Sequence, residues 1–88
     1  MEITLKLFAT LTDYLPHELD GHVRTYNEIP VRVAEGATVQ GVLDRFRVPD
    51  AMAHLVLVNG VFIPRPARAG YALHPGDALA VWPPIAGG

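Results

Sequence analysis

The stretch from residue 29 to residue 63, IPVRVAEGATVQGVLDRFRVPDAMAHLVLVNGVFI, places one helix between two segments with strand character. Apolar and polar residues alternate over 29–33, as in a half-buried strand. Thr38 is a suitable helix N-cap, and Pro49 ends the helical pattern. The apolar residues between them that share one helical face are Val39, Val42, Leu43 and Phe46. We therefore expect one principal helix, from about residue 38 to residue 47.

An antiparallel hairpin is predicted after this helix. Residues 55–58 form a continuous apolar run, which is typical of a strand buried on both faces. Asn59-Gly60 is the preferred dipeptide of a type I′ turn, and the apolar residues 61–63 follow it. The chain is therefore expected to reverse at this dipeptide and to pair the two apolar segments.

Two further strands are predicted near the ends of the chain. Residues 3–7 alternate between apolar and polar side chains, and residues 78–82 follow a type II turn at 74–77, which Asp77 is expected only to complete. One helix and a mixed sheet of four to five strands define an α+β domain, which we place at residues 1–82. If the first and last strands are neighbours in the sheet centre, the rest of the chain leaves from a rigid strand.

The region between the first two strands has the least regular pattern. Thr10-Leu11-Thr12-Asp13 has the form of a helix start and predicts a short helical turn. Residues 16–28 are polar and contain Gly21, so we expect a long surface excursion there. Pro30 cannot donate a backbone hydrogen bond, which favours either an edge position for its strand or a place at the start of the strand.

The composition argues against several classes of function. The net charge is −2 and the basic residues form no stripe, so nucleic acid is not an expected partner. The chain has no cysteine, and no metal site is expected because its four histidines lack ligand spacing. The N-terminus lacks the layout of a signal peptide, and no apolar run is long enough to cross a bilayer. The expected compartment is the cytoplasm, without a membrane partner.

Residues 83–88, PPIAGG, form a predicted flexible tail. Pro83-Pro84 favours an extended backbone at roughly 3.1 Å per residue, which holds the next residues away from the domain. Gly87-Gly88 has no Cβ atoms, so the terminal carboxylate can enter a narrow channel and is open to attack. The alternative is a frayed chain end, at which glycine is common.

Six short segments carry a further signal: Leu7-Phe8-Ala9, Ile29-Pro30-Val31, Glu35-Gly36-Ala37-Thr38-Val39, Val58-Asn59-Gly60, His74-Pro75-Gly76-Asp77 and Pro83-Pro84-Ile85-Ala86-Gly87-Gly88. Together these segments resemble the MoaD/ThiS family of ubiquitin-like sulfur carriers. The similarity extends over nearly the whole chain and implies the β-grasp fold, in agreement with the predicted order of elements. The ending with an aromatic residue, two prolines, an apolar residue and Ala-Gly-Gly is most similar to that of MoaD, the small subunit of molybdopterin synthase. The 16–28 excursion is longer than in many MoaD chains.

The resemblance implies a carrier and cosubstrate without an active site of its own. In this family a partner enzyme uses ATP to convert the terminal carboxylate, here that of Gly88, to an acyl adenylate. A sulfur nucleophile then displaces AMP and leaves a thiocarboxylate. The implied partners are an adenylating enzyme similar to MoeB or ThiF and a MoaE-like large subunit of molybdopterin synthase, which supplies the catalytic residues. No cofactor is expected on the chain itself. The residues implied to insert into the large subunit are Pro83, Pro84, Ile85, Ala86 and Gly87.

Three apolar residues are candidate contacts with these partners. Phe62 and Ile63 follow the Asn-Gly turn, and Trp82 ends the last predicted strand. If they are exposed, they form a docking patch, whereas packing in the core is the alternative. Arg65 and Arg68 are expected to be solvated charges in a loop.

Two alternatives to a molybdopterin role stay open. The same chemistry serves a carrier for thiamine thiazole or for another sulfur-containing cofactor. The second alternative is a protein modifier, in which Gly88 forms an amide with a lysine, or an interaction module whose tail is not activated. A free enzyme is not expected, because the sequence has no nucleophile and base pattern, no paired carboxylates and no phosphate-binding glycine loop.

Overall fold

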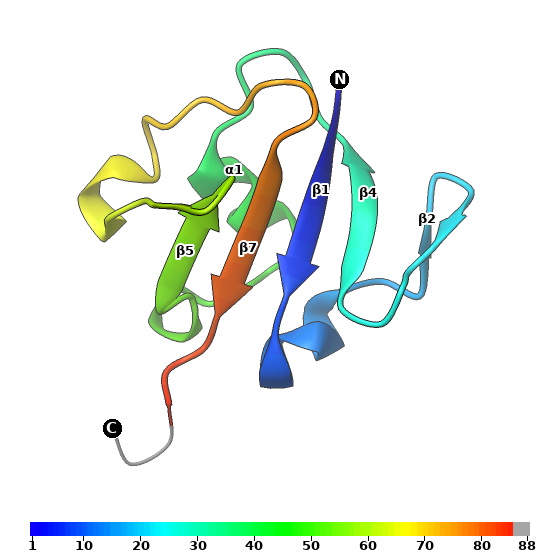
Figure 1. Cartoon of the computed structure of the whole chain (residues 1–88), viewed down its shortest axis with the longest axis horizontal. Coiled ribbons are helices and arrows are strands. Elements are labelled where there is room, and N and C mark those ends of the chain that lie inside the picture. The colour runs from blue at the N-terminus through cyan, green and yellow to red at the C-terminus, as the bar shows by residue number, and fades with distance from the viewer. Residues whose placement is uncertain (86–88) are drawn as a thin grey trace.

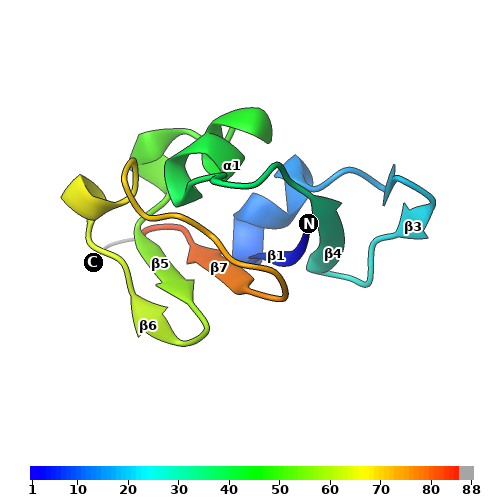
Figure 2. The ribbon, with the colours of Figure 1, turned by 90° about the horizontal axis from the view of Figure 1, so that it is seen from above.

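Residues 1–85, which the computed structural model describes, form a mixed five-stranded sheet with one α-helix on one face (Figures 1 and 2). The strand order is β4-β1-β7-β5-β6. The elements of this sheet and its helix are β1 (Glu2–Leu7), β4 (Glu28–Arg32), α1 (Val39–Arg45), β5 (Leu55–Val58), β6 (Val61–Phe62) and β7 (Ala78–Trp82). Three 3-10 helices are η1 (Ala9–Tyr14), η2 (Asp50–Met52) and η3 (Arg65–Ala67). The arrangement is the predicted β-grasp fold.

The first and last strands are neighbours in the centre of the sheet, as the sequence predicts. β1 pairs in parallel with β7 and antiparallel with β4, and β7 pairs antiparallel with β5. Of the two positions that Pro30 favours, the edge position is confirmed, because β4 is an outer strand. β7 therefore has a hydrogen-bonded neighbour on each side, and the chain leaves the sheet at the end of this central strand (Figure 1).

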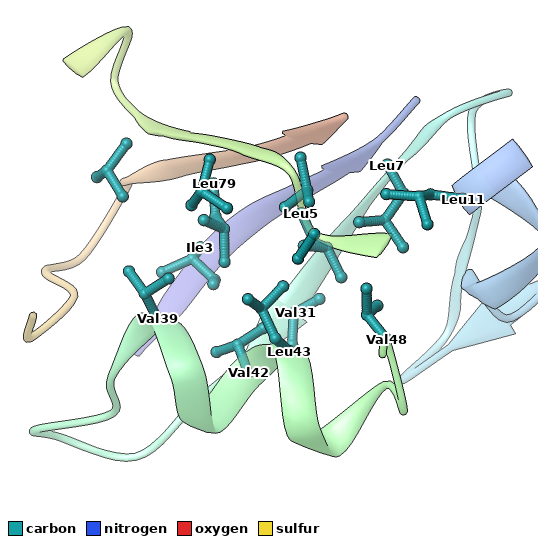
Figure 3. Close-up of a cluster of buried hydrophobic side chains, with 14 of the residues drawn as sticks. Ile3, Leu5, Leu7, Leu11, Val31, Val39, Val42, Leu43, Val48 and Leu79 are labelled. Atoms are coloured by element: carbon teal, nitrogen blue, oxygen red, sulfur yellow. The ribbon is translucent and has the colours of Figure 1, made fainter. Parts of the chain in front are cut away.

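The core lies between α1 and the sheet face that it covers (Figure 3). Alternate residues of β1, β4 and β7 are buried against the helix, as the period-two pattern predicts. Burial of one such aliphatic side chain contributes roughly 1.5–3 kcal/mol. The prediction that β5 is buried on both faces is wrong, because Val56 and Val58 are buried whereas Leu55 is 36% exposed. Among residues 1–85, no helix covers the second face of the sheet (Figure 2).

The helix α1 begins as predicted but ends before residue 47. The Thr38 side chain accepts a hydrogen bond from a backbone N–H of the first turn at 3.0 Å, which confirms the N-cap. The last helical residue is Arg45, because Arg47 has the left-handed φ angle of 59°. The Val48 N–H then donates to the Leu43 carbonyl at 3.0 Å, as in a Schellman motif.

Both predicted turns are present. Asn59 and Gly60 have positive φ angles of 51° and 82°, as a type I′ turn requires. Gly76 has a φ angle of 82°, which fits the third position of a type II turn. The Asp77 N–H closes that turn by donating to the His74 carbonyl at 3.1 Å. Glycine is needed at the third position because an L side chain rarely adopts this conformation.

The region between β1 and β4 is more ordered than the predicted surface excursion. The helical turn expected at residues 10–13 lies within η1. The two-residue strands β2 (Glu18–Leu19) and β3 (His22–Val23) pair as a small hairpin that extends past the β4 edge (Figures 1 and 2). Arg24 anchors this hairpin, because its Nη1 atom donates to the Thr12 carbonyl at 2.7 Å. A long-range side-chain contact of this kind has no local sequence pattern.

Candidate functional site

The candidate site is the point at which the tail leaves the sheet. β7 ends at Trp82, Pro83 is half-buried, and Ile85 is 81% exposed. The predicted tail residues that lie outside the described residues are Ala86, Gly87 and Gly88. The division between a 1–82 domain and an 83–88 tail stays a prediction. In the described part, the chain passes from a central strand to an exposed segment within a few residues.

Phe8 and Trp82 form a stacked aromatic pair at this point. Their ring centroids are 4.2 Å apart and their planes differ by 3°. The pair follows from the topology, because β1 and β7 are parallel neighbours and their ends lie side by side. The Phe8 N–H also donates to the Val81 carbonyl at 3.0 Å. Both aromatic side chains are half-buried, so the pair braces the end of β7 and still presents apolar surface.

Arg68 is buried close to the same end of the sheet, so the prediction that it is a solvated charge is wrong. Its exposed fraction is 2%. Its Nη1, Nη2 and Nε atoms donate to the carbonyls of Ala53, His54 and Ile63 at 2.8, 3.3 and 3.5 Å. These carbonyls take the place of water around the guanidinium, which explains how the charge is accommodated. Arg65 is exposed, as predicted.

The loop held by Arg68 also contacts the last strand. The His54 N–H donates to the Trp82 carbonyl at 3.0 Å, so one residue connects the guanidinium to the start of the tail. Burial lowers the pKa of the Arg68 guanidinium below its usual value; Arg65 lowers this pKa further, whereas Asp50 opposes the shift. The group stays protonated at neutral pH because the ordinary arginine pKa is so high. A buried arginine is usually paired with a carboxylate, and the sequence next to Arg68 contains no acidic residue. The local sequence therefore gives no sign that Arg68 is buried.

The three predicted partner contacts lie in different environments. Phe62 is 54% exposed on β6, and Trp82 is half-buried beside the tail. Ile63 has an exposed fraction of 3% and belongs to the core, so the prediction that it contacts a partner is wrong. The reason is the alternation of side chains along extended backbone, which turns Ile63 to the face opposite that of Phe62.

An apolar strip crosses the sheet face opposite α1. The register pairs Phe62 with Leu57, Leu57 with Ala80, and Leu55 with Trp82. Directly paired residues point to the same face, and α1 covers the other one (Figure 2). The residues of the apolar strip are Phe8, Leu55, Leu57, Phe62, Ala80 and Trp82. Exposed apolar surface of this kind is typical of docking sites, and here it reaches the start of the tail.

Phe8, Leu55 and Leu57 are site residues that the sequence analysis does not identify. The run at 55–58 predicts complete burial, although only alternate positions are buried. Phe8 continues the outward positions of β1, which is a period-two signal that marks its face. Its stacking on Trp82 depends on the parallel pairing of strands from opposite ends of the chain.

Asp77 does more than complete its turn, which corrects the expectation from sequence. One carboxylate oxygen accepts from the His74 N–H at 2.8 Å, and the other accepts from the Asn59 side chain at 2.9 Å. The Ala78 N–H donates to the Asn59 side-chain oxygen at 2.8 Å. Asp77 therefore joins the two turns at the end of β7 opposite to the tail.

No group of three His, Asp or Glu side chains within residues 1–85 is placed to hold a metal ion. In the same range, no helix combines the length and the apolar composition needed to cross a bilayer.

Comparison with known proteins gives a family and several similar structures. A family model described as the ThiS family matches residues 5–88. The comparison with curated proteins gave no match. Among solved structures, the crystal structure of SAMP1 from Haloferax volcanii is 28% identical, with a TM-score of 0.67 and coverage of 100% of both chains.

Two more structures from the same organism are similar. The solution structure of the Haloferax volcanii HVO 2177 protein is 29% identical, with a TM-score of 0.69, and the match covers 100% of this chain and 87% of that one. A crystal structure of H. volcanii small archaeal modifier protein 1 is 27% identical, with a TM-score of 0.64, and the match covers 96% of this chain and 98% of the other. The similarity in each case includes nearly the whole fold.

Proposed function

The chain belongs to the ThiS family of ubiquitin-like carriers and modifiers, and we propose that it carries sulfur as a thiocarboxylate on Gly88. We further propose that it delivers this sulfur in molybdopterin synthesis, as the small subunit of molybdopterin synthase. The observation that carries the proposal is the start of the tail. There a central strand, braced by the Phe8–Trp82 stack, leads into Pro83-Pro84 beside the apolar strip.

The chemistry begins with activation of the Gly88 carboxylate. A carboxylate is a poor acyl donor, because its leaving group would be an oxide ion. Transfer of AMP from ATP, on an adenylating partner similar to MoeB or ThiF, makes AMP the leaving group. A sulfur nucleophile then attacks the carbonyl carbon, the bond to AMP breaks, and a thiocarboxylate results. Gly87 and Gly88 favour this reaction because no Cβ obstructs the carbonyl group.

The described residues contribute docking and direction to this reaction. We propose that the apolar strip docks on the adenylating enzyme and later on a MoaE-like large subunit, because the same tail must enter both partners. Ile85 and the exposed surface of the Phe8–Trp82 pair lie at the end of the strip where the tail begins. From this end, in the proposal, the tail enters the partner. In this proposal ATP binds to the adenylating enzyme, and the catalytic groups for sulfur transfer belong to the large subunit.

A protein modifier is the second candidate function. It is favoured by similarity to a protein named small archaeal modifier protein 1, at 27% identity over 96% of this chain. Both functions need an activated Gly88 carboxyl group. They differ in the acceptor, which is a sulfur nucleophile for the carrier and a lysine amine of another protein for the modifier.

The intact mass of the protein tests the carrier function. The chain is incubated with ATP, a sulfide source and the adenylating enzyme encoded nearest to it, and its C-terminal peptide is fragmented. We expect one oxygen of Gly88 to be replaced by sulfur. Addition of a MoaE-like subunit and the pterin precursor should then return the terminus to a carboxylate and produce molybdopterin.

A variant without Gly88, and a variant with one residue added after it, are the matched controls. Both should lose sulfur transfer and keep the melting temperature, because the tail contributes little to the core. The adenylating enzyme is also tested on another carrier. If it activates that carrier but leaves the terminus of this chain unmodified, the result would contradict the proposal. Sulfur transfer by either variant would contradict it as well.

A further inference from the structure

Lys6 is the only lysine of the chain. Lysine and arginine together number 7, so the remaining six cationic side chains are arginines. A guanidinium stays protonated at neutral pH and is a poor nucleophile, whereas the lysine ammonium loses its proton more readily. Lys6 therefore has the only side-chain amine that can form an amide with an activated carboxyl group.

The α-amino group of Met1 is the other amine, and it is already engaged. It donates to the Val33 carbonyl at 2.8 Å in a partly buried position next to the end of β4. To attack an acyl group, this amine would have to give up its hydrogen bond and detach the start of the chain. Lys6 needs no such rearrangement.

Lys6 lies near the centre of the open sheet face. It is paired with Glu28 of β4 and with Ala80 of β7, so it points to the face that carries the apolar strip. Its side chain is half-exposed, and no carboxylate within residues 1–85 approaches its Nζ atom to 4.0 Å. The Ala80 side chain is small and leaves one flank open. An acyl group that approaches from solvent therefore meets an amine that is not held in an ion pair.

We propose that Lys6 is the acceptor when the activated Gly88 carboxyl group of one copy is transferred to a second copy of the chain. This inference rests on the activation of Gly88 in the proposed function. The neutral Lys6 amine attacks the carbonyl carbon of the acyl adenylate and forms the C–N bond. The C–O bond to AMP breaks, AMP leaves with the electron pair, and the amine proton passes to water. ATP is the only co-reactant, and nothing is oxidised or reduced.

The geometry favours the tail of a second copy over that of the same copy. The tail starts after Trp82, whereas Lys6 lies back along the sheet beside Ala80. Pro83-Pro84 keeps the backbone extended as it leaves the sheet. The tail would have to reverse direction within a few residues to reach the amine of its own domain.

Sulfide and Lys6 compete for the same acyl adenylate in this proposal. A sulfur nucleophile gives the thiocarboxylate, and the Lys6 amine gives an isopeptide bond between two copies. Linked copies should therefore accumulate when the adenylating enzyme and ATP are present without a sulfur source. Adding sulfide should reduce their amount as the thiocarboxylate increases.

The experiment uses the full chain with ATP, Mg²⁺ and the adenylating enzyme, without sulfide. Intact mass measurement should detect a species with twice the mass of the chain less one water, and peptide fragmentation should place the bond between Gly88 and Lys6. Lys6→Arg keeps the positive charge and removes the amine. This variant should lose the linked species while the release of pyrophosphate from ATP stays unchanged.

Other results would overturn the inference. These are linkage at Met1, a cyclised single copy, undiminished linkage in the Lys6→Arg variant, or no linkage although pyrophosphate is released. The last result leaves the proposed activation of Gly88 intact. If the enzyme does not activate the chain, a chemically prepared Gly88 thioester supplies the acyl donor instead. Linkage of this thioester at Lys6 would support the inference, and linkage elsewhere or none would overturn it.

Discussion

At the scale of single residues, Arg68 departs from the tendency of charged groups to stay at the surface. Its guanidinium is buried, and no carboxylate within residues 1–85 approaches it to 4.0 Å. The carbonyls of Ala53, His54 and Ile63 accept its hydrogen bonds instead. Arg68 thus connects the loop before β5 to the end of β6. This connection supports the strand from which the tail leaves.

Replacement of Arg68 tests this structural role. In Arg68→Met the three carbonyls lose their donors, and we expect the free energy of unfolding to fall by roughly 1–3 kcal/mol. Arg65→Met is the matched control, because Arg65 is exposed and its change should stay within about 1 kcal/mol. Urea unfolding followed by Trp82 fluorescence measures both. Equal losses in the two variants would contradict a special role for the buried group.

At the scale of elements, the end of α1 shows how a helix stops without glycine. Arg47 has a φ angle of 59°, at the position where a Schellman motif usually has glycine. The left-handed conformation costs a non-glycine residue roughly 1–2 kcal/mol. The Val48 side chain is buried, so packing holds the chain in this turn.

Arg47→Gly should therefore stabilise the protein. Glycine removes the strain of the left-handed conformation, but it also raises the conformational entropy of the unfolded chain, which offsets part of the gain. We expect the free energy of unfolding to rise by about 0.5–1 kcal/mol. Arg45→Gly, within the helix, should instead destabilise by about 1 kcal/mol. Thermal unfolding distinguishes the two variants. A lower melting temperature for Arg47→Gly would show that its side chain has a stabilising contact that outweighs the strain.

The apolar strip is also a property of elements, because three neighbouring strands and the end of β1 contribute to it. In the reaction of the adenylating enzyme, with this chain as its substrate, Phe62→Ala should raise the KM for the chain by roughly fivefold and leave kcat unchanged. This increase corresponds to the loss of about 1 kcal/mol of docking free energy. Val61→Ala is the control, since Val61 is 61% exposed on the same strand but outside the strip. An unchanged KM in Phe62→Ala would exclude β6 from the docking surface.

At the scale of the whole molecule, the parallel pairing of β1 with β7 places the first and last strands side by side in the sheet centre. Cooperative opening of this pair requires most of the fold to open, whereas the β2–β3 hairpin lies outside the main sheet. Stability is therefore expected to be uneven along the chain.

Amide hydrogen exchange measures this difference directly. We expect the slowest exchange in β1 and β7 and fast exchange in β2 and β3. Deletion of residues 85–88 should leave exchange in β7 unchanged, because no described contact of β7 depends on the tail. Faster exchange in β7 than in β4 would contradict the central role of the pair.

The predictions from sequence succeed where the physical cause is local. The spacing of Val39, Val42 and Leu43 identifies the buried face of α1, and Asn59-Gly60 identifies the hairpin turn. They fail where the cause is distant in sequence. Arg68 is buried because carbonyls of other segments accept its hydrogen bonds.

Local sequence patterns are sufficient to predict the order of the main-sheet strands and α1, and the core-facing sides of β1 and β4. The same patterns predict the tail at residues 83–88 on which the proposed function rests. Periodicity, turn preferences and the absence of side chains at Gly87-Gly88 are properties of neighbouring residues. Which side chains meet at the start of that tail depends instead on the tertiary fold. Phe8 stacks on Trp82, and Lys6 lies beside Ala80, only because strands from opposite ends of the chain pair in the sheet centre.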